Sequence, residues 1–171
     1  PMSQSDPMHA ISAIDGRYQG KTKALAAICS EFGLMKFRTK VECRWVAFLG
    51  DLTEVAELPA LSADDKQFLD SVINNFDEAA ASRIKAFEAT TNHDVKAVEY
   101  YLKQRFSERE TQAPLSEWIH FACTSEDINN TAYGLMVKAA TDEVLLPQMD
   151  ALIAEINALA DAALQALQQN H

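Results

Sequence analysis

Glycine and proline are scarce in this sequence, with 5 of each among 171 residues. An all-β domain needs turn residues every 8 to 12 positions or so, and this sequence has too few of them. No apolar run approaches the roughly 18 residues of a membrane-spanning helix. The three cysteines (Cys29, Cys43 and Cys123) are odd in number, widely spaced and without a C-x-x-C pair, which argues against a disulfide framework or a zinc ribbon.

Positive charge is also scarce. The sequence has 15 Lys and Arg residues against 25 Asp and Glu residues, which gives a formal net charge of −10. Nucleic acids and anionic membrane surfaces attract proteins through an excess of Lys and Arg. We therefore expect neither a nucleic acid nor a membrane as a partner. The first residues lack the apolar run of a signal peptide, and the expected compartment is the cytoplasm.

The residues that are abundant favour helix. Apolar residues make up 48% of the chain, and Ala, Leu, Glu, Lys and Gln are frequent. Apolar side chains recur at three- and four-residue steps over residues 21–52, with a restart near Ser30. Further helices are predicted from Ser62, from Asp77, from the cluster at residues 92–94, around residues 116–121 and from Ser125 to the end. No segment has the pattern of a strand, so the predicted fold is all-α.

The polar stretch at residues 107–115 predicts a domain boundary. We expect an N-terminal helical domain over residues 1–112 and the beginning of a long-helix bundle domain over residues 113–171. The last helix has two overlapping apolar seams, one of which includes Leu152, Ile156 and Leu159. Together the seams make an apolar face wider than a two-stranded coil needs. Pro147 is expected to bend this helix rather than end it. Such a helix needs several helical neighbours, from the same chain or from other subunits.

The run Asn92-His93-Asp94 places an amide, an imidazole and a carboxylate at a predicted helix entrance. Free backbone N–H groups and the helix dipole favour an anion at that position, and imidazole changes protonation near neutral pH. The alternative is a capping cluster, in which Asn92 or Asp94 satisfies the first-turn amides and His93 is incidental.

Thr124 and Ser125 place two hydroxyls at the start of the last helical stretch, an arrangement suited to a substrate carboxylate. Here the alternative is an N-cap by Ser125, with Asp127 in the first turn. Arg17 and Tyr18 follow Asp15-Gly16, where Arg17 could bind phosphate through two hydrogen bonds, or where the run could be a surface turn. His120 is expected to be a hydrogen-bonded core histidine, Cys123 a buried structural thiol, and the four histidines show no metal-ligand spacing.

Several of these segments together resemble the adenylosuccinate lyase family. The run T-T-N-H-D-V-K-A-V-E-Y-Y-L-K at residues 90–103 is the most specific, and H-F-A-C-T-S-E-D-I-N-N at residues 120–130 supports it. The Asp15–Tyr18 run and the segment Gly33–Arg38 are similar as well. The resemblance covers nearly the whole chain in order and spacing, and the bacterial branch of the family is the most similar.

This resemblance implies cleavage of adenylosuccinate to AMP and fumarate, and of the related succinyl-aminoimidazole carboxamide ribotide, by β-elimination without a metal or organic cofactor. By position, Arg17 and Tyr18 would bind the phosphate side of the nucleotide. Asn92, His93 and Asp94 would line the substrate, with His93 in proton transfer or phosphate binding. Thr124 and Ser125 would hold a carboxylate of the succinyl group, and Lys96 could lie near this site.

The family's serine loop, G-S-S-x-M-P-x-K, and its acid histidine in a T-H-G-type segment do not occur in this sequence. We therefore expect the chain to be the N-terminal part of a longer enzyme and to be inactive alone. The resemblance also implies a homotetramer whose active sites combine three subunits. Two alternatives stay open: another fumarate-releasing enzyme such as argininosuccinate lyase, and a non-catalytic helical module that binds partner helices.

Overall fold

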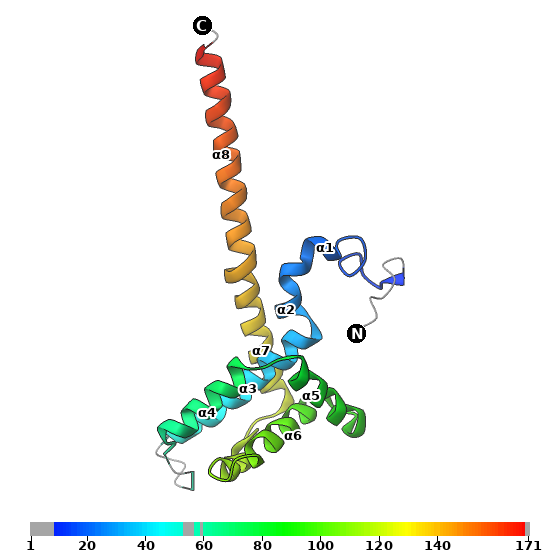
Figure 1. Ribbon diagram of the computed structural model, residues 1–171, viewed down its shortest axis with the longest axis vertical. Helices are drawn as coiled ribbons and strands as arrows, with labels where there is room; N and C mark the ends of the chain where they lie inside the picture. The colour runs from blue at the N-terminus through cyan, green and yellow to red at the C-terminus, as the bar shows by residue number, and fades with distance from the viewer. Residues whose placement is uncertain (1–8, 53–56, 59, 170–171) are drawn as a thin grey trace. The chain divides into compact units, whose positions relative to one another are not determined.

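The computed structural model describes residues 9–52, 57–58 and 60–169 (Figure 1). Within these ranges the regular structure consists of helices, without a strand, which confirms the all-α prediction. The chain divides into two compact units, Ala27–Met136 and the combination of Pro1–Ala26 with Val137–His171. The domain boundary expected near residue 112 stays a prediction.

The Ala27–Met136 unit is built from a series of helices that follow one another along the chain. They are α2 (Ala26–Cys29), α3 (Glu31–Asp51), α4 (Ala63–Asn74), α5 (Glu78–Thr91), α6 (Asp94–Ser107), the 3-10 helix η3 (Ala113–Trp118) and the first turns of α7 (Ser125–Ala140). The central element is α3, which packs against α4, α5 and α6, while α5 and α6 pack against each other. The 3-10 helix begins at Ala113, earlier than the helix predicted from residue 116, because Pro114 fits a first helical turn.

Local side-chain signals set where these helices begin, as the sequence predicts. Ser30 caps α3 by accepting a hydrogen bond from the Gly33 amide. Ser62 and Asp65 form a reciprocal capping box at the start of α4. The carboxylate of Asp77 caps α5 by accepting from the Ala80 amide at 2.8 Å. Each cap satisfies N–H groups that the helix itself cannot pair.

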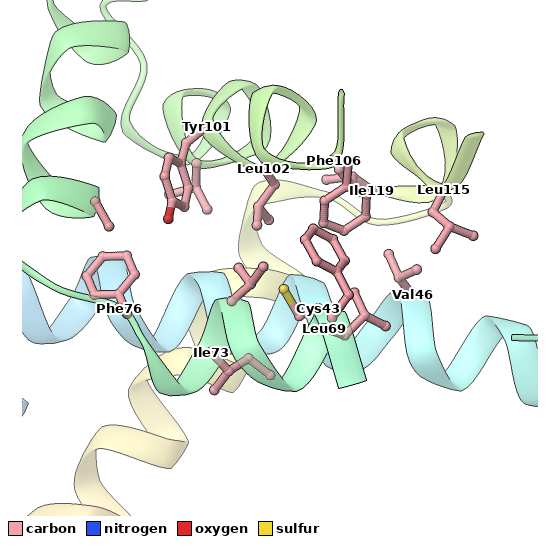
Figure 2. Packing of buried hydrophobic residues seen from close by; sticks show 14 of the residues in the cluster. Cys43, Val46, Leu69, Ile73, Phe76, Tyr101, Leu102, Phe106, Leu115 and Ile119 are labelled. Carbon is pink, nitrogen blue, oxygen red and sulfur yellow. The ribbon is translucent and has the colours of Figure 1, made fainter. Parts of the chain in front are cut away.

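The core of this unit lies where α3, α4, α6 and the segment of η3 meet (Figure 2). Aromatic and aliphatic side chains fill it, and several are fully buried: Cys43, Val46, Phe68, Leu69, Ile84, Val98, Leu102 and Phe106. Phe68 and Phe106 meet edge to face at 5.2 Å. Burial raises the pKa of the Cys43 thiol far above its usual range, which makes this residue a structural thiol.

One close approach fixes the start of α3. A side chain at Gly33 would run into the backbone of Ile28, because the end of α2 comes back onto the first turn of α3. Glycine removes the Cβ that would collide there. The turn at Ser30, where the sequence predicts a restart, therefore depends on both the Ser30 cap and the absence of a side chain at position 33.

In the second unit, α8 (Leu146–Gln169) follows a π-helical turn over Thr141–Leu145. Pro147 cannot donate a backbone hydrogen bond to the carbonyl of Glu143, and a π turn is a usual way to absorb such a gap within a helix. Pro147 therefore does not end the helix, in agreement with the prediction. All described residues of α8 are exposed, including the apolar seam at Leu152, Ile156 and Leu159. Among the described residues, no helix is long and apolar enough to span a membrane.

Candidate active site

The junction between α5 and α6 is made by three of the predicted site residues, which we call the α6 entrance: Asn92, His93 and Asp94. Asn92 ends α5 in the left-handed conformation, at φ 51°, where asparagine is among the better tolerated residues. His93 is the N-cap of α6, because its Nδ1 accepts a hydrogen bond from the Lys96 amide at 3.2 Å. The cluster therefore caps α6, as the alternative expected, because Asp94 also accepts a hydrogen bond from the Val95 amide of the first turn at 2.9 Å. His93 takes part in this cap and is not incidental, and its role toward a substrate stays a prediction.

This capping bond also fixes the protonation pattern of the His93 ring. An Nδ1 that accepts a hydrogen bond carries no proton, so the proton of the neutral ring lies on Nε2. The side chain of His93 is about half exposed, at 52%. Nε2–H is thus a proton donor on a half-exposed ring at a helix N-terminus, next to the positive end of the helix dipole.

The start of α7 is the second predicted site, which we call the α7 entrance: Thr124 and Ser125. Thr124 precedes the helix, and the Asp127 carboxylate accepts from its amide at 2.7 Å and from its hydroxyl at 2.9 Å. These two hydrogen bonds lower the pKa of Asp127. Ser125 is the first residue of α7 and not its cap, and within the described part of the chain its hydroxyl has no hydrogen-bond partner.

Arg38 of α3 links the α6 entrance to α7. Its Nε donates to Oδ1 of Asn129 in the first turns of α7 at 2.9 Å, and its terminal nitrogen lies 2.7 Å from Oδ2 of Asp94. Only 6% of the Arg38 side chain is exposed. Beside it, Val95 and Ile128 from the first turns of α6 and α7 pack against Val41 of α3. Arg38 and Val41 of α3 therefore hold the first turns of α6 and α7 together.

The charge of Arg38 determines the ionisation of its partner. Burial alone would raise the pKa of Asp94, but the hydrogen bond and charge of Arg38, with the bond from the Val95 amide, outweigh it and lower the pKa. Asp94 is therefore firmly ionised at neutral pH. No sequence pattern marks Arg38 as a site residue, although it stands in the segment Gly33–Arg38 that carries part of the family resemblance.

A polar cavity of about 350 Å³ opens at the α6 entrance. Its walls come from α3, α5 and the α5–α6 junction: Glu31, Leu34, Met35, Arg38, Ile84, Glu88, Asn92, His93 and Asp94. Three of the predicted site residues thus share a cavity with a buried guanidinium. Lys96, one turn into α6, pairs with Glu99 at 2.8 Å, and this hydrogen bond raises the pKa of the lysine.

His120 is hydrogen-bonded in the interior, as expected. Its Nδ1 lies 2.7 Å from one oxygen of Glu42, and its backbone N–H donates to the other at 2.9 Å. Cys123 is half-buried, and burial raises the pKa of its thiol. Among the residues that the structure describes, no group of three or more His, Cys, Asp or Glu side chains could hold a metal ion.

Arg17 and Tyr18 belong to the other unit. They follow a turn closed by hydrogen bonds from Gly16 to Ser12 and from Tyr18 to Ala13. The Arg17 guanidinium lies 5.5 Å from the centre of the Tyr18 ring, and both side chains are exposed. The structure therefore links the α6 entrance to the first turns of α7 through Arg38, while a phosphate-binding role for Arg17 and Tyr18 stays a prediction.

Comparison with known proteins bears on this geometry. A family model described as lyase matches residues 16–168, which include both helix entrances. The chain belongs to this lyase family. Relatives named adenylosuccinate lyase include those of Vibrio cholerae (55% identical), Haemophilus influenzae (52%) and Escherichia coli K12 (52%). The matches cover 89%, 92% and 88% of this chain but 33%, 35% and 33% of the relatives, so the chain spans about a third of their length.

Proposed function

We propose that this chain is part of a lyase that cleaves adenylosuccinate to AMP and fumarate, and the succinyl-aminoimidazole carboxamide ribotide to its carboxamide and fumarate. The observation that carries the proposal is the contact of one buried guanidinium, Arg38, with Asp94 of the α6 entrance and with Asn129 in the first turns of α7. A helix N-terminus with a buried guanidinium beside it is suited to an anionic substrate even in a chain with a formal net charge of −10.

In this proposal the α7 entrance holds a carboxylate of the succinyl group through the Ser125 hydroxyl and the free amides of the first turn. His93 acts at the leaving side: its Nε2–H donates to the substrate, either in proton transfer or to hold the phosphate. Asn92 and Asp94 line the same cavity. Arg17 and Tyr18 bind the phosphate side of the nucleotide.

The complete active site needs groups that this sequence does not contain. Neither the serine loop nor the T-H-G-type segment of the family is present in the 171 residues. We therefore propose that the chain alone does not turn over substrate. We further propose a cytoplasmic homotetramer of purine nucleotide biosynthesis, in which α8 joins a bundle shared between subunits and other subunits complete each site.

An activity assay tests the proposal. A protein of the relatives' length that carries this sequence should release AMP and fumarate from adenylosuccinate, and the 171-residue chain should release neither. Cleavage of argininosuccinate in place of adenylosuccinate would move the chain to another branch of fumarate-releasing enzymes. If the long protein has no lyase activity but binds other helices, the non-catalytic interaction module is the better description.

His93 gives the sharpest test within the site, because its catalytic and capping roles can be separated. In the long protein, His93→Ala removes both, whereas His93→Asn keeps a good N-cap and removes the imidazole. Both variants should lower kcat/KM by on the order of 100-fold or more, as expected for an acid–base group. Thermal unfolding should show that only His93→Ala loses stability. If His93→Asn kept the wild-type kcat/KM, His93 would be a helix cap without a catalytic role.

A further inference from the structure

The segment that leads into the α7 entrance is held in an unusual backbone conformation. His120 and Ala122 have φ values of 62° and 57°, in the left-handed region that residues with a Cβ rarely adopt. Such a conformation costs free energy and persists only where surrounding contacts hold it. The segment 119–124 lies outside regular helix, between η3 and α7, so neighbouring elements must supply these contacts.

One face of α3 supplies them. Arg38, Glu42 and Trp45 stand at positions i, i+4 and i+7, and therefore point to the same side of the helix. Glu42 binds His120 through both carboxylate oxygens, and Trp45 Nε1–H donates to the carbonyl of Phe121 at 2.8 Å. Arg38 binds Asn129 beyond the entrance. We call these three residues the α3 stripe. Their hydrogen bonds hold the chain in place before and after Thr124 and Ser125.

Burial of the Glu42 carboxyl at this position is energetically unfavourable. Its side chain is fully buried, and desolvation raises the pKa of the carboxyl, against the hydrogen bonds and charge of His120, which lower it. On the far side of the ring, His120 Nε2 lies 3.9 Å from Glu99 of α6, and Glu99 is itself paired with Lys96. A hydrophobic side chain would fill the Glu42 position at lower cost, so packing alone does not account for a carboxylate there.

We propose that Glu42 and His120 are positioning residues, which fix the α7 entrance, Thr124 and Ser125, against α3. The kinetic consequence rests on the proposed function, whereas the structural consequence does not. If the α7 entrance holds a substrate carboxylate in both the ground state and the transition state, a misplaced entrance weakens binding and raises KM with little change in kcat.

The first arm of the test uses two variants that tolerate the left-handed backbone equally. His120→Asn keeps a side-chain N–H near the position of Nδ1, whereas His120→Gly keeps only the backbone conformation. In the long protein, His120→Gly should raise KM for adenylosuccinate about tenfold, which corresponds to the loss of one strong hydrogen bond, with kcat unchanged. His120→Asn should restore most of the affinity. A purely structural role would lower kcat, through a smaller active fraction, at unchanged KM.

The second arm needs no enzymatic activity. Amide hydrogen exchange in the 171-residue chain should be about tenfold faster in His120→Gly than in wild type at Thr124 and Asp127, and unchanged at Leu102 in the core. Trp45→Phe, which loses the bond to Phe121 and keeps an aromatic ring beside Phe48, should change exchange in the same direction and serves if His120→Gly does not fold. Unchanged exchange in the folded variant overturns the proposal. If exchange responds while the long protein lacks lyase activity, the positioning role stands and the proposed function falls.

Discussion

A single guanidinium connects the α6 entrance with the first turns of α7 in the candidate site. Arg38 is buried, and it binds the neutral Asn129 amide on one side and the Asp94 carboxylate on the other. A buried guanidinium without partners would be strongly destabilising, so Arg38 depends on both contacts as much as the helices depend on it. The ion pair thus connects α3 with α6, and it stabilises this contact only while Asp94 is ionised.

Asp94→Asn should weaken this contact in a pH-dependent way. At pH 7 we expect a loss of about 1 kcal/mol in the free energy of unfolding, a modest value because half of the Asp94 side chain is exposed. The lowered folded-state pKa makes the stabilisation fully present above the unfolded Asp pKa of about 3.9, and it is lost as pH falls through the folded-state value. Urea unfolding of both proteins at pH 7 and at about pH 3 measures this difference.

Asp64→Asn is the matched control. Asp64 also stands in the first turn of a helix, α4, and has no ion pair within the described ranges. Both substitutions remove a favourable interaction with a helix dipole, so a larger pH-dependent effect at Asp94 isolates the contribution of Arg38. Equal effects at the two positions would mean that the ion pair adds nothing measurable.

At the level of elements, the starts of the helices could be predicted because their signals are local. A cap such as Ser62 or Asp77 acts on an amide three residues away. The contacts that assemble the site are not local: Arg38 and Asn129 are 91 positions apart, and Glu42 and His120 are 78 apart. Periodicity and capping patterns carry no information on such pairs. The two helix entrances could therefore be predicted from the sequence, whereas Arg38 and Glu42 could not be predicted as part of the site.

The capping box of α4 offers a stability test at this scale. Ser62→Ala should cost about 1 kcal/mol in the free energy of unfolding, because one amide loses its cap. Asp65→Ala should cost more, on the order of 2 kcal/mol, because the buried Gln112 amide also loses the acceptor that it now reaches at 2.9 Å. Ser82→Ala on the exposed face of α5 is the control, and denaturant unfolding should place it within about 0.5 kcal/mol of wild type. A Ser62→Ala effect as small as the control would show that the box contributes little.

For the molecule as a whole, the most conspicuous surface is α8. Its apolar side chains are exposed, among them Leu152 at 61%, Ile156 at 55% and Leu159 at 70%. Apolar surface of this extent is unfavourable in water and marks an interaction site in most proteins that carry it. The wide apolar face predicted from sequence is therefore present, and the shared bundle proposed above gives it a use.

This surface should make the chain self-associate. Light scattering across a range of concentrations should give a mass above 18.9 kDa, and Leu159→Glu should shift the equilibrium toward monomer by a factor of about ten or more, since it places a charge in the seam. Gln165→Glu adds the same charge to α8 outside both seams and should leave the mass unchanged. A wild-type chain that stays monomeric at every concentration would count against the bundle.

The close approach at Gly33 has a consequence for how this chain can vary. Any other residue would place a Cβ into the carbonyl of Ile28, so relief would require the end of α2 to move away from α3. The same residue supplies the amide that Ser30 caps, so that movement would also undo the beginning of α3. Position 33 is therefore closed to substitution for reasons of space alone, and selection would keep glycine there even in a descendant that had lost every enzymatic role.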